Sequence, residues 1–352
     1  MRVLLTGASG FIGTHVNAGL VAAGHDVVQV DLLLPSAHGE GAPVPDGVHR
    51  VDVRDADALA PLLTAVDVVC HQAAVVGAGI DSADAPAFAS HNDFGTAVLL
   101  AEMQASGCGR LVLASSMVVY GDGRYTCAQH GTVTPPPRTG SDLAAGEFDC
   151  RCPVDGSVLT WALVDEEAPL RPRSLYAASK MAQENYALAW SLASGGSVTA
   201  LRYHNVYGEG MPRDTPYSGV AAMFRSSLEI GQSPRVFEDG RQTRDFVHVR
   251  DVAAANVAAV EHELPGFHPL NICSGHPSTI GEVAAALAAQ HGGTAPVVTG
   301  QYRPGDVRHV VADPARAAEL LGFRAGITLE EGMAEFAHAP LRDAVPTARP
   351  RV

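Results

Sequence analysis

A short apolar stretch followed at once by a glycine-rich turn is the feature that most constrains the fold of this chain. Residues 2–5 read as a buried strand, residues 14–23 as a helix and residues 27–30 as a second strand. Three glycines, Gly7, Gly10 and Gly13, stand between the first strand and the helix. In such a unit the glycines permit a tight turn, the close approach of a pyrophosphate and the packing of the helix on the sheet. The pattern predicts a dinucleotide site in which the helix N-terminus, from Phe11 and Ile12 on, faces the phosphates.

The residue that ends the second strand, Asp31, indicates which dinucleotide is bound. A carboxylate at this point accepts both ribose hydroxyls of NAD and repels the additional phosphate of NADP. Three leucines follow Asp31, and no arginine stands beside it. NAD is therefore the predicted cofactor.

Strands and helical segments alternate through the first two thirds of the chain. Further strands are expected at residues 66–71, 110–114 and 198–202, each preceded by a helical segment. This alternation predicts an α/β fold, a Rossmann-type doubly wound parallel sheet covered on both faces, with a small C-terminal substrate-binding lobe. We expect the NAD-binding domain at 1–206, with an inserted loop at about 122–171. The lobe would span 207–338, and residues 339–352, rich in Pro and Arg, would form a flexible tail.

Composition and charge narrow the classes of function. The formal net charge of −14 argues against nonspecific binding of nucleic acid. The six cysteines are scattered, no signal peptide precedes the first strand and no apolar run is long enough to span a bilayer. The expectation is a cytoplasmic enzyme without disulfides and without a membrane partner.

The chain contains a single lysine, and it lies four residues after a tyrosine, in the sequence Tyr176–Lys180. Residues four apart share one face of a helix, so both side chains can reach one substrate. Arginine occupies every other permanently basic position, yet it cannot replace an amine whose work depends on a compact, tunable ammonium. Tyr176 and Lys180 are therefore candidate catalytic residues.

Several motifs together make the chain resemble the extended short-chain dehydrogenases/reductases, in the NAD-dependent group of nucleotide-sugar epimerases and dehydratases that includes UDP-galactose 4-epimerase. The motifs are TGASGFIG from Thr6, Asp52-Val53, HQAA from His71, Asn92 with Gly95-Thr96, Ser115-Ser116, Tyr176 with Lys180, and LRYHNVYG from Leu201. The resemblance implies that Asp52 and Val53 contact the adenine and that Ala73 and Ala74 line the cofactor groove. It also places Asn92, Ser115, Tyr176 and Lys180 at the cofactor, Ser116 as the catalytic hydroxyl and Asn205 as a substrate ligand.

The expected chemistry starts with the oxidation of an alcohol. A free tyrosine with a pKa near 10 is a poor base at pH 7. The Lys180 ammonium would lower the pKa of Tyr176 and hold the nicotinamide ribose, and Ser116 would hydrogen-bond the reacting oxygen.

The reaction type follows from what is missing. Dehydratases of this group carry an Asp-Glu pair after the catalytic hydroxyl, where this chain has Met117 and Val118. The prediction is therefore epimerisation, most often at carbon 4, through a keto sugar. A nucleotide-sugar oxidoreductase or 4-keto reductase remains an alternative, and a non-catalytic NAD-binding regulator a remote one.

The substrate is expected to carry a diphosphate. Arg244 and Arg303 match family positions that grip phosphate, and Asp306 would face the ribose or the base. Either a dTDP- or a UDP-linked sugar fits these residues. The insertion resembles that of bacterial proteins assigned as dTDP-rhamnose 4-epimerases, which implies a dTDP-6-deoxyhexose such as dTDP-L-rhamnose.

The insertion itself carries a candidate zinc site. Cys127 and His130 form a CxxH pair, and Cys152 opens a CPxDG sequence that resembles a zinc knuckle. Asp155 stands where a second knuckle cysteine is usual, so Asp155 or Cys150 would complete the site. The alternative is a loop that folds without metal.

A homodimer is the last expectation. Family members often pair two helices from each subunit, and the candidates are the helices at about residues 92–106 and 175–194. The alternative is that these apolar faces only pack on the parent sheet.

Overall fold

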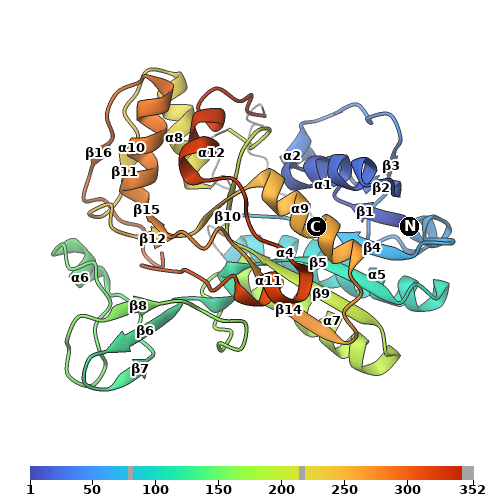
Figure 1. The fold of residues 1–352 in the computed structure, drawn as a ribbon, viewed down its shortest axis with the longest axis horizontal. Helices are drawn as coiled ribbons and strands as arrows, with labels where there is room; N and C mark the ends of the chain where they lie inside the picture. Colours follow the sequence, from blue (N-terminus) through green and yellow to red (C-terminus); the bar gives the residue numbers. More distant parts are fainter. Residues whose placement is uncertain (78–81, 214–218, 343–352) are drawn as a thin grey trace.

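The computed structural model describes residues 1–77, 82–213 and 219–342. A parallel sheet of seven strands, in the order β14-β9-β5-β4-β1-β2-β3, forms its centre (Figure 1). The strands are β1 (Arg2–Thr6), β2 (Asp26–Asp31), β3 (Val48–Arg50), β4 (Val68–His71), β5 (Arg110–Ser116), β9 (Ser197–Tyr203) and β14 (Phe267–Ile272). The predicted fold class is confirmed. The strand order reverses between β1 and β4, and ligands of doubly wound sheets bind at such a switch point.

Helices cover both faces of this sheet because consecutive strand residues point to opposite sides. Val3 and Leu5 pack with α1 (Phe11–Ala22), α9 (Val249–Glu261) and α11 (Ala315–Leu321). Leu4 points the other way, toward the layer formed by α5 (Gly95–Ser106) and α7 (Leu175–Ser194). The shorter helical segments are α2 (Pro35–His38), α3 (Ala56–Leu59), α4 (Ala85–Phe88), a π-helical stretch at Ala89–Phe94 and 3₁₀ turns at Ala60–Leu63, Ser82–Asp84 and Met117–Tyr120.

A second apolar core lies beyond the carboxyl ends of the strands. It is built by α8 (Val220–Glu229), α10 (Ile280–His291) and α12 (Leu329–Phe336). The short strands around it are β10 (Asn205–Tyr207), β11 (Arg235–Val236), β12 (Thr243–Arg244), β13 (Phe246–His248), β15 (Ser278–Thr279) and β16 (Val297–Val298). A domain boundary after residue 206 stays a prediction, and the central sheet crosses it, because α9 and β14 return from the lobe to the sheet.

The insertion forms a separate projection at the lower left of Figure 1. Its three-stranded antiparallel sheet consists of β6 (Arg124–Cys127), β7 (Gly131–Val133) and β8 (Thr160–Ala162), and α6 (Gly140–Ala144) follows β7. Its own core is small: Tyr125, Cys127, Cys150, Cys152 and Leu159 are buried together. A core of so few apolar side chains gives limited stability, so a bound metal ion or another cross-link would stabilise the insertion further.

The predicted tail begins as ordered structure. Ala339 is buried, and Arg342 donates to the carbonyl oxygens of Ser9 and Gly10, at 2.6 and 3.0 Å. Residues 343–352 of the expected flexible tail lie outside the described residues. Arg342 is thus held against the glycine turn, and the flexibility of the tail stays a prediction.

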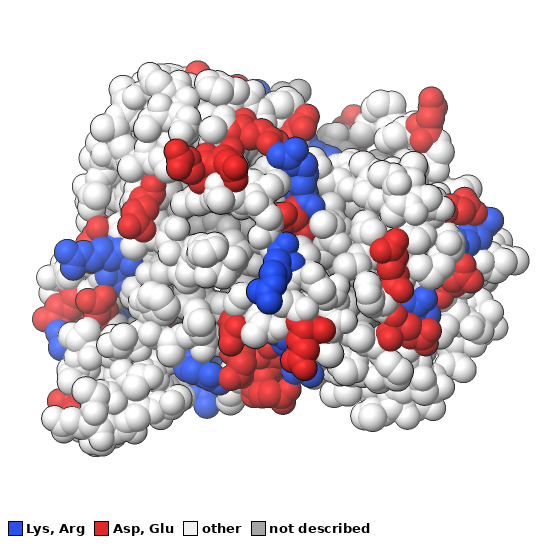
Figure 2. Space-filling view, in the orientation of Figure 1, with Lys and Arg blue, Asp and Glu red and all other residues white. Residues whose placement is uncertain are grey.

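The described part of the chain contains no helix long and apolar enough to cross a membrane. On the face drawn in Figure 2, basic side chains lie singly or in small groups beside acidic ones, without a broad basic surface. The absence of nonspecific nucleic-acid binding, expected from net charge, stays a prediction.

Candidate active site

The glycine turn between β1 and α1 can be built only from glycine at two positions. Gly7 has a φ of +68°, and a Cβ there would lie 2.7 Å from the backbone nitrogen of Ala73. A Cβ on Gly13 would lie 1.9 Å from the carbonyl oxygen of Gly7. Gly10 precedes α1 in extended conformation. The turn thus brings backbone close to backbone and leaves the helix N-terminus as a cradle that suits a pyrophosphate, so the residues fit NAD.

Asp31 lies at the carboxyl end of β2, beside this turn. Its carboxylate accepts hydrogen bonds from the backbone nitrogens of Ser9 (2.9 Å) and Leu33 (2.8 Å). The His38 ring lies 3.7 Å away. These contacts fix the carboxylate at the carboxyl end of β2, where the adenosine ribose of a dinucleotide would lie.

The predicted adenine contacts, Asp52 and Val53, follow β3. Arg54 forks onto Asp52 through Nε (3.0 Å) and Nη2 (2.7 Å). Burial would raise the pKa of Asp52, but the hydrogen bonds and charge of Arg54 outweigh it, and the pKa lies below its ordinary value. Asp52 and Arg54 line one hollow with Ser90 and Phe94. Sequence reasoning missed Arg54, which orders this end of the groove.

The strand β4 leads into the predicted cofactor groove at Ala73 and Ala74. The Ala73 nitrogen donates to Thr6 Oγ1 at 3.2 Å. Asn92 is fully buried, and its amide exchanges hydrogen bonds with the backbone of Val75 (2.8 and 3.0 Å) and donates to Ser179 Oγ (2.9 Å). Asn92 was expected to touch the cofactor. Because these contacts tie the groove to α7, they favour a positioning role for Asn92.

Two serines end β5, and they face different ways. Ser116 caps the Met117–Tyr120 turn, where its Oγ accepts from the Val118 nitrogen (3.4 Å), and it hydrogen-bonds Tyr176. Ser115, expected at the cofactor, is buried and donates instead to Glu184. Glu184 forms a buried ion pair with Arg202 (2.7 Å). Adjacent strand residues point to opposite faces, which explains why only Ser116 reaches the tyrosine.

Tyr176 and Lys180 lie one turn apart on α7, as their spacing predicts. Lys180 is buried, its Nζ donates to the Ala114 carbonyl oxygen at 2.9 Å and lies 5.9 Å from the centre of the Tyr176 ring. Burial lowers the pKa of Lys180 to about 8, against the charges of Glu184 and Asp93, which raise it. The lysine is therefore held as a compact donor at the end of β5.

The pKa of Tyr176 differs from the expectation. Burial raises it above the ordinary value, and the hydrogen bond from Ser116 works in the opposite direction. The ammonium of Lys180 points to the Ala114 carbonyl instead of the phenol oxygen. Burial therefore sets the direction here, and a lowering by Lys180 with NAD bound stays a prediction.

Asp93 is a residue that sequence reasoning missed. It lies between Asn92 and Phe94 in the π-helical stretch, and its charge acts on Lys180. Burial raises the pKa of Asp93 to about 6, although Lys180 lowers it. Its Oδ1 is buried without a hydrogen-bond partner among the described residues. The signal in the sequence was an acid at the first variable position of the Asn-x-x-Gly-Thr motif, directly after Asn92.

The predicted substrate residues gather near the second core. Asn205 opens β10, and its Oδ1 is buried without a hydrogen-bond partner within the described ranges. Arg303 lies over the ring of Phe237, 5.2 Å from its centre. Asp306 lies in the same loop, where burial raises the pKa of its carboxyl against the charges of Arg303 and Arg244. Phe237, an aromatic face beside these charges, was not singled out from the sequence.

Arg244 was expected to grip phosphate, and in the structure it holds this loop. Its Nη1 donates to the carbonyl oxygens of Thr243 and Arg308, both at 2.9 Å, and its Nη2 to that of Val307 at 2.7 Å. A phosphate contact stays a prediction, and it would require one of these nitrogens to exchange partners.

The candidate metal ligands of the insertion come together. One donor atom from each of Cys127, His130, Cys152 and Asp155 lies within 4.8 Å of all the others. His130 Nδ1 is 3.3 Å from Cys127 Sγ, 3.5 Å from Cys152 Sγ and 3.6 Å from Asp155 Oδ2. Cys150, the alternative fourth ligand, instead hydrogen-bonds the Tyr125 hydroxyl. The geometry thus selects Asp155.

Comparison with known proteins gives a consistent answer. The model of the NAD dependent epimerase/dehydratase family matches residues 3–144 and 160–273. A dTDP-L-rhamnose 4-epimerase of Burkholderia thailandensis is 34% identical over 95% of this chain and 93% of its own length. Two solved structures are similar over 96% of this chain. The UDP-glucose 4-epimerase of Thermus thermophilus in complex with NAD has a TM-score of 0.74 at 30% identity over 98% of its length. The UDP-glucose 4-epimerase of Thermotoga maritima with UDP-glucose has a TM-score of 0.76 at 26% identity over 97%.

The internal gap between the two matched ranges, residues 145–159, lies inside the insertion and carries Cys150, Cys152 and Asp155. The glycine turn, Ser116, Tyr176 and Lys180 all lie within the matched ranges. On the fold, this site and the similarity to these relatives, the chain belongs to the NAD-dependent epimerase/dehydratase family.

Proposed function

We propose that this protein is an NAD-dependent epimerase of a nucleotide-diphosphate sugar that inverts carbon 4 through a transient 4-keto sugar. The observation that carries the proposal is the grouping of Ser116, Tyr176 and Lys180 at the carboxyl end of β5, next to the glycine turn that fits NAD. The relatives described above, which are named as 4-epimerases, support the same reaction.

In this mechanism NAD supplies a hydride acceptor that also returns the hydride. Tyr176 removes the proton from the carbon-4 hydroxyl, and Ser116 donates a hydrogen bond to that oxygen as it becomes a carbonyl. Lys180 would hold the nicotinamide ribose. After the keto sugar has turned over, Tyr176 returns its proton to the oxygen. Since burial raises the pKa of Tyr176, a positive charge brought beside the phenol has to offset that effect.

The alternative functions are separable by simple measurements. A nucleotide-sugar oxidoreductase or 4-keto reductase would change the absorbance at 340 nm in step with turnover, whereas an epimerase leaves it constant in the steady state. Steady accumulation or consumption of NADH would overturn the epimerase. A non-catalytic regulator would bind NAD and invert no sugar.

We infer that the substrate is a dTDP-linked 6-deoxyhexose, with dTDP-L-rhamnose as the first compound to test. The Burkholderia relative carries that name, and Arg303, Asp306 and Phe237 supply charge and an aromatic face for a nucleotide. UDP-linked sugars are the second class, as in the two solved structures. A comparison of kcat/KM for both classes decides between them. The cytoplasmic location stays a prediction.

We also propose a structural zinc ion held by Cys127, His130, Cys152 and Asp155. Two thiolates, an imidazole and a carboxylate are ligands that zinc accepts in tetrahedral sites. Their donor atoms already lie together, in a module with a small core. Metal analysis of protein purified without a polyhistidine tag should give about one zinc per chain, and Cys152→Ser should lower it. A content below about 0.2 zinc per chain would end the proposal.

We propose, finally, that the protein is a homodimer built through α5 and α7. Large apolar side chains are exposed on this layer: Phe94 at 55%, Tyr186 at 48%, Leu188 at 37% and Leu192 at 79%. Leu188 and Leu192 lie one turn apart on α7, so they share a face. Exposed apolar side chains of this kind are typical of an interface.

A further inference from the structure

Much of the contact between the insertion and the C-terminal lobe involves residues 306–313. The backbone nitrogen of His309 donates to the Tyr125 hydroxyl at 3.1 Å, and Arg308 Nε donates to the Asp149 carboxylate at 3.0 Å. Further along, Val164 exchanges backbone hydrogen bonds with Val311 (2.9 Å) and Asp313 (3.0 Å). The insertion therefore borders the segment that follows directly on Arg303.

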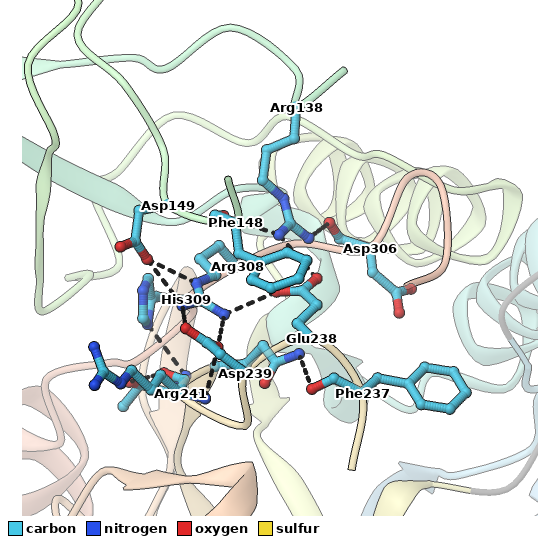
Figure 3. A network of polar contacts seen from close by, with 12 residues as sticks. Arg138, Phe148, Asp149, Phe237, Glu238, Asp239, Arg241, Asp306, Arg308 and His309 are labelled. Atoms are coloured by element: carbon cyan, nitrogen blue, oxygen red, sulfur yellow. Dashed lines mark hydrogen bonds and ion pairs between the residues drawn. The ribbon is translucent and has the colours of Figure 1, made fainter. Parts of the chain in front are cut away.

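The side chain of Arg138, in the insertion, reaches into this contact. Arg138 is nearly buried, and its Nη1 lies 2.8 Å from Glu238 Oε1 and 3.0 Å from the Phe148 carbonyl oxygen. Its Nη2 donates to the backbone carbonyl of Asp306 at 2.6 Å (Figure 3). A single guanidinium thus joins the insertion to two parts of the lobe.

Both parts carry groups assigned above to the nucleotide. Asp306 and Arg303 share one loop, and Glu238 follows Phe237, whose ring lies under Arg303. Glu238 is 2% exposed and also pairs with Arg308, at 2.8 Å. Its backbone nitrogen donates to the Gln301 carbonyl (2.7 Å), which ties the Phe237–Glu238 turn to the start of the loop.

We propose that Arg138 is a positioning residue for the nucleotide of the substrate, so that the insertion sets the geometry of the loop with Arg303 and Asp306. The proposal rests on the proposed function, since it takes that loop and Phe237 as the nucleotide site. Arginine suits this role because its planar fork reaches several fixed acceptors at once, whereas the ammonium of lysine is a point charge. The insertion then determines affinity for the nucleotide without touching the reacting carbon.

The test measures binding of UDP and dTDP to the NAD-loaded protein by titration calorimetry, for wild type, Arg138→Lys and Arg138→Gln. Both variants should raise the Kd for the nucleotide about tenfold, the effect of a lost hydrogen bond from a charged group. The Kd for NAD should stay within about twofold, and KM for the sugar nucleotide should rise much more than kcat falls. A rise in KM with little change in kcat and in NAD affinity is what a positioning role predicts. A general loss of structural order would weaken all three.

Arg151→Ala is the matched control. Arg151 is an exposed arginine of the same insertion that pairs with Glu147 at 2.8 Å and donates to Gly156. It should leave both dissociation constants unchanged. Circular dichroism and metal content of each variant establish that the insertion is intact.

Three results would overturn the proposal. The first is unchanged nucleotide affinity in folded Arg138→Lys and Arg138→Gln. The second is a parallel loss of NAD and nucleotide affinity, and the third is failure of both variants to fold. Wild-type protein that binds neither UDP nor dTDP would instead refute the nucleotide-sugar assignment itself. Binding of these nucleotides without epimerisation would count against the proposed reaction and leave the role of Arg138 standing.

Discussion

At the scale of single residues, the account depends on the group formed by Ser116, Tyr176 and Lys180. Ser116 hydrogen-bonds the tyrosine, and Lys180 is fixed by the Ala114 carbonyl at 2.9 Å. The phenol and the ammonium therefore have separate partners, which suits one group that moves a proton and another that holds a ribose. Each can be tested alone.

Replacing Tyr176 by Phe should abolish most turnover and spare NAD binding. The change removes only the hydroxyl that takes the proton, and loss of a general base costs a factor on the order of 10² or more. Steady-state kinetics together with NAD titration measures both effects. Turnover within about fivefold of wild type would remove Tyr176 from the mechanism.

Lys180→Arg should cause severe loss, although the charge is kept. Lys180 is 4% exposed and fits between the Tyr176 ring and the Ala114 carbonyl. A planar guanidinium is larger and spreads its donors, and a misplacement of about 1 Å can cost roughly 10²-fold. The variant is assayed for turnover and for NAD affinity. More than about half of wild-type turnover with normal NAD affinity would make this lysine an accident of composition.

Asp31→Ala should weaken NAD binding and narrow the preference for NAD over NADP. The carboxylate that would accept the ribose hydroxyls and repel a phosphate is lost, and with it the hydrogen bonds to Ser9 and Leu33. Fluorescence titrations with both cofactors measure the ratio. If the two affinities kept the wild-type ratio, the assignment of Asp31 would be wrong.

At the scale of elements, the glycine turn and the helix α7 were predictable, and the long-range contacts were not. Gly7, Gly13 and the Tyr176–Lys180 pair depend on local spacing, which the sequence displays directly. Ser115 and Asn92 were expected at the cofactor because they belong to motifs. Their side chains point to Glu184, Val75 and Ser179, partners that lie far away in the chain. Arg138 escaped notice for the same reason, since its partners in the lobe lie 100 or 168 residues further on.

The boundary between the NAD-binding domain and the lobe also depends on a long-range contact that the local sequence pattern does not predict. The apolar stretch that forms β14 lies between the lobe helices α8 and α10 in sequence, so pattern alone assigned it to the lobe. In the fold it pairs with β9 because a buried parallel strand needs a neighbour on which to place its backbone groups. Which distant strand supplies that neighbour cannot be read from local periodicity.

At the scale of the whole molecule, stability should depend on pH through two buried histidines. Burial, with Lys180 near His71 and Arg244 near His204, lowers the pKa of each to about 3. In the unfolded chain a histidine takes up its proton near pH 6.5. Between these values the unfolded state binds more protons, so stability is retained above about pH 6.5 and falls as pH drops toward 3.

Denaturant unfolding at pH 7.5, 6 and 5 tests this dependence. The free energy of unfolding should fall by about 1 kcal/mol per pH unit for each histidine below pH 6.5. His71→Asn should reduce the slope, and His49→Gln, at an exposed position, should not. A stability that stays constant from pH 7.5 to 5 would contradict the account of these buried groups.

The homodimer is the second prediction at this scale. Leu188→Glu combined with Leu192→Glu should give a monomer, because it places two charges on the exposed face of α7. Ile230→Glu, at a position that is 69% exposed at the end of α8, is the control and should leave the dimer intact. Light scattering at micromolar concentration gives the mass. A monomeric wild-type protein would refute the interface.

The central claim is that this chain inverts one carbon of a nucleotide sugar without net redox change. The most direct measurement incubates the NAD-loaded protein with a panel of dTDP- and UDP-linked sugars and follows each by mass spectrometry and proton NMR. We expect one substrate to keep its mass while the coupling constants at carbon 4 change to those of the epimer. A product that has lost water or hydrogen, or a full panel that stays unchanged under conditions where NAD and nucleotide bind, would contradict the account.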